Sequence, residues 1–200
     1  ANEACLYIGI FLDDAEMVND AIAYYKTGKG GGCITEGIVF GGQPVEMGRD
    51  QPHAAIGIDA YADHCQALWN QGLDMYAYED NLLLKGFEYY ARFNLEHPVD
   101  WTPIDYHGHK FYYPAPSNNA PSSMPNNRIL ANEAVYHHYV DRKGLDAPYL
   151  RAMMKLKNVE VLTGMMYTYS DTTTAYVSFP VPPIPEDVKV TGSIGRIDLD

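Results

Sequence analysis

Residues 53–72, His-Ala-Ala-Ile-Gly-Ile-Asp-Ala-Tyr-Ala-Asp-His-Cys-Gln-Ala-Leu-Trp-Asn-Gln-Gly, carry the clearest helical pattern of the chain. The apolar side chains that follow one another at intervals of four, three and four positions are Ile58, Ala62, Cys65 and Trp69. This spacing places them on one face of an α-helix. Gly72 stands where such a helix would end, because glycine readily adopts the left-handed conformation of a C-terminal cap. We therefore expect a helix over residues 53–71 with its apolar face against a core.

Helical patterns recur on both sides of this segment, joined by short links. Apolar spacing predicts further helices over residues 3–12, 14–26, 80–95, 128–141, 147–157 and 159–169. Asp80 is the expected N-cap of the helix over 80–95. One face of that helix is expected to carry Leu83, Phe87, Tyr90 and Asn94. Residues 33–51 are predicted to be a loop with an extended piece at 34–40. Antiparallel helical hairpins stacked side by side predict an all-α fold, either layered or toroidal.

Two segments do not fit this helical pattern. Residues 97–127 form a long, irregular segment rich in proline and aromatic residues, and such segments in compact domains are usually functional or mobile. Residues 172–179 look extended, and a proline-rich linker follows at 180–185. The sequence therefore predicts an α-helical domain over residues 1–172 and an extended C-terminal tail over 173–200.

Composition bounds the classes of function. Two hundred residues with 46% hydrophobic content suit one globular domain with a sizeable core, and no apolar run is long enough for a membrane span. A formal charge of −12 argues against nucleic-acid binding, which needs basic patches. The three cysteines Cys5, Cys33 and Cys65 match no zinc motif. They are expected to be small buried residues, with one disulfide left open as an alternative.

Residues 46–53 gather polar side chains at a predicted loop-to-helix junction. Glu46, Arg49, Asp50 and His53 occur within eight positions. A guanidinium such as that of Arg49 can bind a carboxylate through two hydrogen bonds. A histidine such as His53 can transfer a proton near neutral pH. This segment therefore predicts a site for an acidic substrate with acid–base chemistry.

The ordered motifs that carry a family resemblance are Gly-Arg-Asp-Gln-Pro-His (48–53), Trp-Asn-Gln-Gly (69–72), Asn-Leu-Leu-Leu-Lys-Gly-Phe-Glu-Tyr (81–89) and Glu-Ala-Val-Tyr-His-His-Tyr (133–139). Over residues 2–160 the chain resembles the alginate-lyase-like superfamily of polysaccharide lyases. It has His137 where that family usually has asparagine. The family fold is an (α/α) toroid, and this chain resembles its C-terminal half. The resemblance thus implies an incomplete toroid whose N-terminal helices are missing, and upstream sequence is expected before Ala1.

The resemblance implies cleavage of a uronic-acid polymer, alginate or glucuronan, by β-elimination, which leaves a 4,5-unsaturated uronate end. By position in the motifs, His53 would be the base or would help to neutralise the substrate carboxylate. Tyr136 would be the acid, and also the base for one orientation of the sugar ring. Asn2 and Arg128 would polarise the carboxylate. A tyrosine that acts as a base needs a lowered pKa, which an adjacent arginine can provide.

Further expectations follow from the same resemblance. The side chains expected to bind substrate are Arg49, Gln51, His138 and Tyr139. We also expect the Arg49–Asp50 pair to form a structural salt bridge. The reaction needs no metal or cofactor, the partner would be an acidic polysaccharide, and the location would be secreted or periplasmic.

Two other interpretations stay open. A glycoside hydrolase on an α/α toroid would need two carboxylates that flank the scissile bond, and the candidates are Glu46, Asp50, Glu88 and Glu133. A non-catalytic half-toroid would bind carbohydrate and need a partner chain or a homo-oligomer. It would expose apolar faces that the missing helices normally cover. An ultraviolet-absorbing unsaturated product separates a lyase from a hydrolase.

Overall fold

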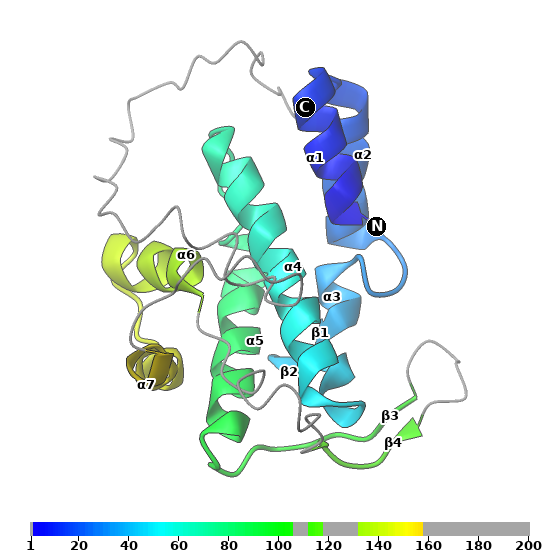
Figure 1. Ribbon diagram of the computed structural model, residues 1–200. Helices are drawn as coiled ribbons and strands as arrows, with labels where there is room; N and C mark the ends of the chain where they lie inside the picture. The colour runs from blue at the N-terminus through cyan, green and yellow to red at the C-terminus, as the bar shows by residue number, and fades with distance from the viewer. Residues whose placement is uncertain (1, 106–111, 118–131, 158–200) are drawn as a thin grey trace.

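The computed structural model describes residues 2–105, 112–117 and 132–157, and this part of the chain is mostly helical (Figure 1). Its helices are α1 (Asn2–Leu12), α2 (Ala15–Thr27), α3 (Ile34–Gly37), α4 (Gln51–Asn70), α5 (Tyr78–Asn94), α6 (Glu133–Tyr136) and α7 (Pro148–Lys157). A 3₁₀ turn, η1 (Val45–Gly48), precedes α4, and a π-helical turn, η4 (His137–Arg142), follows α6. The predicted all-α class is confirmed. Arg128, the expected helix at 159–169 and the tail over 173–200 lie outside the described residues.

Two short antiparallel strand pairs accompany the helices. β1 (Ile38–Val39) pairs with β2 (Gln43–Pro44), with Ile38 opposite Pro44. β3 (Ile104–Asp105) pairs with β4 (Tyr112–Tyr113). The β3–β4 pair belongs to the segment predicted to be irregular. Among the described helices, none combines the length and apolar character needed to cross a membrane.

α4 and α5 form the central antiparallel hairpin, as their short connection predicts (Figure 1). Gln71 caps the end of α4, and Gly72 follows with a φ of 87°. At the opposite end of the hairpin, the last residue of α5 meets the first residue of α4. There Asn94 donates a hydrogen bond from Nδ2 to Oε1 of Gln51 at 2.8 Å.

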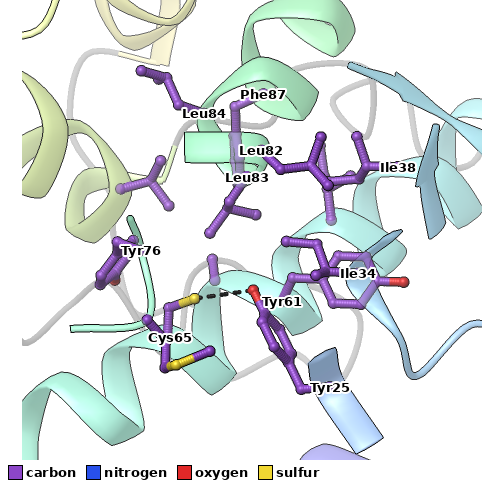
Figure 2. Close-up of a cluster of buried hydrophobic side chains, with 14 of the residues drawn as sticks. Tyr25, Ile34, Ile38, Tyr61, Cys65, Tyr76, Leu82, Leu83, Leu84 and Phe87 are labelled. Carbon is purple, nitrogen blue, oxygen red and sulfur yellow. Dashed lines mark hydrogen bonds between the residues drawn. The ribbon is translucent and has the colours of Figure 1, made fainter. Parts of the chain in front are cut away.

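The core lies between this hairpin and the helices α2 and α3. Ile58, Ala62 and Cys65 of the predicted stripe are at most 1% exposed, and Trp69 packs against them half-buried. Figure 2 shows the apolar side chains of α5 facing those of α3, β1 and α4, with labels on Ile34, Ile38, Tyr61, Cys65, Leu82, Leu83, Leu84 and Phe87. The apolar periodicity of α4 and α5 therefore identified the buried face of each helix.

All three cysteines are free thiols. Cys33 and Cys65 are buried as expected, but Cys5 is exposed on α1, so the expectation was wrong for that residue. The Cys65 sulfur lies 3.2 Å from the Tyr25 hydroxyl oxygen. Burial raises the pKa of the Cys65 thiol to about 12, which keeps it protonated and unreactive near neutral pH.

Three local predictions differ from the structure. Residues Ile34–Gly37 form a helical turn and only Ile38–Val39 are extended, because this arrangement buries both Ile34 and Ile38. In the described part of the predicted helix over 128–141, residues Glu133–Tyr136 form a regular α-helix, which then widens into η4.

Asp80 is the third difference, because it does not cap α5. It has a φ of 52°, in the left-handed region, and its carboxylate accepts a hydrogen bond from Lys85 Nζ at 2.7 Å. Its neighbours Glu79 and Asn81 share this backbone conformation. The regular part of α5 therefore begins only after this turn.

α1 carries an exposed apolar face. Its large exposed side chains are Tyr7, Ile8, Phe11 and Leu12, of which Phe11 is 87% exposed. The opposite side of α1 packs on α2, where Leu6 is fully buried. An uncovered face of this kind is what the half-toroid interpretation predicts. The toroidal arrangement itself stays an interpretation.

His64 gives the fold a specific sensitivity to acid. Its ring stacks on Tyr25 with centroids 4.4 Å apart, and its Nε2 has no hydrogen-bond partner. Burial lowers the pKa of His64 from 6.5 to about 4. The unfolded chain therefore binds more protons than the native chain between those two pH values, so stability falls as the pH drops through this window.

We expect His64→Phe to remove this loss, because phenylalanine keeps a ring against Tyr25 and does not titrate. The linkage amounts to about 3 kcal/mol between neutral pH and a pH of about 4. Urea unfolding at both pH values, for wild type and His64→Phe, measures it. An equal loss of stability in the two proteins would contradict the assignment.

Candidate functional site

An Asp–His pair stands at the N-terminus of α4. Asp50 is the N-cap, and its carboxylate accepts a hydrogen bond from the His53 backbone N–H at 2.9 Å. Both carboxylate oxygens also lie 2.7 Å from His53 Nδ1. Pro52 suits this first turn, because proline has the φ of a helix and needs no N–H partner there. With Nδ1 donating to Asp50, Nε2 is the ring nitrogen that can accept a proton from a substrate.

Arg49 places a cation beside this pair. Its guanidinium lies 3.7 Å from Glu46 Oε2 and 3.8 Å from Asp50 Oδ2. The Arg49–Asp50 pair confirms the expected salt bridge. Both distances exceed that of a good hydrogen bond, and the Arg49 side chain is 49% exposed. A carboxylate from solution can therefore approach this guanidinium without breaking a tight contact.

His53 lines a hollow of about 220 Å³ that is partly open to solvent. The walls come from α4, from the segment before it and from the glycines near residue 31. Tyr61 joins these parts, since its hydroxyl lies 3.0 Å from the Gly31 carbonyl and 3.2 Å from that of Cys33. A Cβ on Gly37 would lie 1.8 Å from the Tyr61 hydroxyl oxygen, so glycine is required there. The hollow combines apolar walls with the polar groups of Glu46, His53 and Tyr61.

Asn2 lies in a different hollow, between α1 and α2, of about 390 Å³. Its side-chain amide donates to the Ala21 carbonyl at 3.0 Å. Gly31 lines the hollow of His53, and a Cβ on the next residue, Gly32, would lie 3.3 Å from Asn2 Cβ. The structure therefore places Asn2 near the His53 hollow but does not bring the two side chains into contact.

Tyr136 ends α6 and faces α7. Its hydroxyl interacts with Arg151 of α7, and this interaction raises the pKa of that arginine. α6 is tied to α4 at Asp59, about 9 Å of helix rise beyond His53. Among the contacts of the described residues, none joins Tyr136 to His53. The two predicted catalytic side chains are thus separate in this structure.

Gln51, His138 and Tyr139 are fully buried. Gln51 donates to the Ser117 carbonyl at 2.6 Å and accepts from Asn94, so its amide is committed to the fold. The Tyr139 hydroxyl donates to the Tyr76 carbonyl at 2.6 Å. The prediction that these three side chains bind substrate is therefore not supported, because they have no exposed surface with which to contact one.

His138 is held in place by contacts within the fold. Its ring stacks on Tyr76 at 4.1 Å between centroids and meets the Trp69 ring edge-on at 4.8 Å. Its Nε2 lies 3.3 Å from Asp74, which also pairs with Lys143 at 3.0 Å. The contacts with His138 and Lys143 hold the pKa of Asp74 down to about 2, although burial acts to raise it. The motif around His138 therefore anchors η4 to the end of α4.

The residues that sequence reasoning missed act through contacts between distant segments. Asn132 caps α6 by accepting from the Val135 N–H, and its amide donates to Asp59 at 2.7 Å. Arg151 interacts with Tyr136 and was not among the predicted site residues. The cap could have been predicted, because Asn132 stands just before a helical segment. The interaction of Arg151 with Tyr136 could not, because no local sequence pattern indicates it.

In the described ranges, no group of three or more His, Cys, Asp or Glu side chains is arranged to hold a metal ion. Comparison with protein-family models, with curated proteins and with solved structures gave no match to this chain.

Proposed function

We propose that this chain is a polysaccharide lyase that cleaves a uronic-acid polymer, alginate or glucuronan, by β-elimination. The observation that carries the proposal is the Asp50–His53 pair, whose imidazole is 43% exposed and lines a hollow. A histidine held by a carboxylate through Nδ1 is suited to accept a proton at Nε2. The motif resemblance supports the same class of reaction.

β-Elimination makes three demands on the site. The proton at C5 of the uronate is weakly acidic, so the charge that develops on the adjacent carboxylate must be stabilised. A base must remove this proton, and an acid must protonate O4 as the C4–O4 bond breaks. The electron pair of the C5–H bond forms the C4–C5 double bond of the new chain end.

The residues near the hollow suit the first two demands. His53 Nε2 would take the C5 proton, and Asp50 would position the imidazole. Arg49 would bind the uronate carboxylate, because it is half-exposed and only loosely paired with Glu46 and Asp50. The positive end of the α4 dipole also favours an anion at this position.

The acid is a separate part of the proposal. The motif resemblance gives this role to Tyr136, and it gives carboxylate polarisation to Asn2 and Arg128. Arg151 interacts with Tyr136 and would support it in this role. Since no described contact joins Tyr136 to His53, the acid and the base need independent tests.

The rest of the proposal concerns the setting of this domain. The helices would form part of an (α/α) toroid of the alginate-lyase-like type, and the exposed face of α1 would be covered by a missing N-terminal half or by another copy of the chain. The substrate is an extracellular polymer, so we propose a secreted or periplasmic location. The acidic polysaccharide is the proposed partner.

The hydrolase interpretation finds less support among the four candidate carboxylates. Glu88 accepts the backbone N–H groups of Tyr149 and Leu150 at 3.2 and 2.7 Å and so caps α7. Asp50 caps α4 and holds His53. Two of the four carboxylates are therefore committed to helix termini.

The experiment that tests the proposal is incubation of the full chain with polymannuronate, polyguluronate and glucuronan in turn, with ultraviolet absorbance followed over time. A rise on one polymer would establish β-elimination and identify the uronate. New reducing ends without this absorbance would indicate hydrolysis instead. The absence of both from a folded preparation would sink the enzymatic proposal.

Asp50→Asn tests the positioning role of the carboxylate. Asparagine is also a good N-cap, so α4 should keep its start and the protein its thermal stability. Without the carboxylate on Nδ1, kcat should fall by at least about tenfold, part of the roughly 10²–10⁴-fold that a positioned base contributes. Initial rates with saturating polymer measure the effect. An unchanged kcat would remove Asp50 from the mechanism.

A further inference from the structure

Glycine inside a helix lowers its stability relative to alanine, so each such glycine calls for a physical reason. α1, α4 and α5 each contain one, at Gly9, Gly57 and Gly86. A Cβ on Gly9 would lie 2.9 Å from a methyl carbon of Val18. A Cβ on Gly86 would lie 2.6 Å from Ile38 Cδ1. Close packing therefore explains Gly9 and Gly86.

Close packing does not explain the glycine at position 57, because a Cβ built there would meet nothing within 4 Å. It lies four residues after His53, so the two positions are neighbours on one face of α4. Both line the same hollow of about 220 Å³. The missing side chain of Gly57 thus leaves open space directly beside the proposed base.

We infer that Gly57 keeps this hollow open for one sugar ring, that of the uronate whose C5 proton His53 removes, and so determines which substrates fit. This inference rests on the proposed function. The hollow is smaller than the roughly 300–1,000 Å³ typical of sites for drug-sized ligands, which suits a single ring. Ile56, 46% exposed, and the bare backbone at Gly57 offer apolar surface to the C–H face of the ring, and Glu46 offers a polar edge.

Gly57→Ala and Gly57→Leu separate the folding role from the binding role. Gly57→Ala should raise Tm, because it improves helix propensity and has room for the methyl group. Gly57→Leu should keep the fold, yet raise the KM for the cleaved polymer by at least about tenfold, because its side chain fills the hollow. The matched control is Ala23→Leu, which adds the same side chain to an exposed position of α2 and should leave KM unchanged.

Isothermal titration with the same three polymers accompanies the kinetics. Product formation with an unchanged KM for Gly57→Leu would overturn the subsite and leave the lyase proposal standing. If no product forms but the polymer binds Gly57→Leu at least about tenfold more weakly than wild type, the subsite is supported and the lyase proposal is refuted. If the wild-type chain forms no product and binds none of the polymers, the subsite and the lyase proposal are both overturned. A lower Tm for Gly57→Ala would show that the fold itself requires glycine, and would also overturn the inference.

Discussion

His53→Ala should lower kcat on the cleaved polyuronate by about 10²–10⁴-fold, the contribution of a positioned general base, while the protein stays folded. The fold should survive because the Asp50 carboxylate caps the backbone N–H of residue 53, which alanine retains. The His53 ring is also partly exposed, so its loss leaves no buried cavity. Initial rates and thermal melts of the variant measure the two effects.

The control is His97→Ala, which makes the same substitution at an exposed histidine that contacts the Tyr149 ring and does not line the hollow. This variant should keep the wild-type rate. Tyr136→Phe tests the acid separately, because it removes only the hydroxyl. Loss of rate in His53→Ala alone would keep the base and reject Tyr136 as the acid. Full activity in both His53→Ala and Tyr136→Phe would reject the residue assignment.

Asn132→Ala should destabilise the protein by about 2–4 kcal/mol, the largest stability effect that we expect from a single polar side chain here. Asn132 is 1% exposed and uses both ends of its amide. Its oxygen caps α6 through the Val135 N–H at 3.0 Å, and its nitrogen donates to Asp59 at 2.7 Å. Alanine removes the cap and takes a donor away from a buried carboxylate. Urea unfolding near neutral pH measures the loss.

A double-mutant cycle shows whether the Asn132–Asp59 contact causes this loss. Asn132→Asp alone keeps an N-cap but sets two carboxylates against each other, so it should be strongly destabilising. Adding Asp59→Asn reverses the polarity of the pair and should restore most of the lost stability. A coupling energy near zero would show that the two side chains act independently.

The long helices were predictable because their signals are local. The apolar residues of α4 recur every three or four positions, and Gly72 lies just after the end of that helix. α7 covers Pro148–Lys157, within one residue of the predicted range 147–157. Burial overrode the local preference at residues 34–37, which form a helical turn that buries Ile34. Asp80 also differs from its predicted N-cap role, because it adopts a left-handed conformation at an exposed position.

The same distinction between local signals and contacts from distant segments applies to the site. The polar segment at residues 46–53 was recognisable, since a carboxylate three positions before a histidine at a helix start can reach it without help from the rest of the chain. The burial of Gln51 was not predicted, because its partners Asn94 and Ser117 come from other segments of the chain. His138 is likewise buried by a residue from another segment, because its ring stacks on Tyr76.

By itself, the sequence determined the helical class, the apolar faces of α4 and α5, and the polar junction that contains Asp50 and His53, since each depends on residues within a few positions of one another. Only the tertiary structure decided that Gly31, Tyr61 and Gly57 enclose a hollow beside His53. It alone separated Tyr136 from that hollow and paired it with Arg151. The physical reason is that packing between segments far apart in the chain sets which side chains remain accessible, and no local pattern encodes those distances.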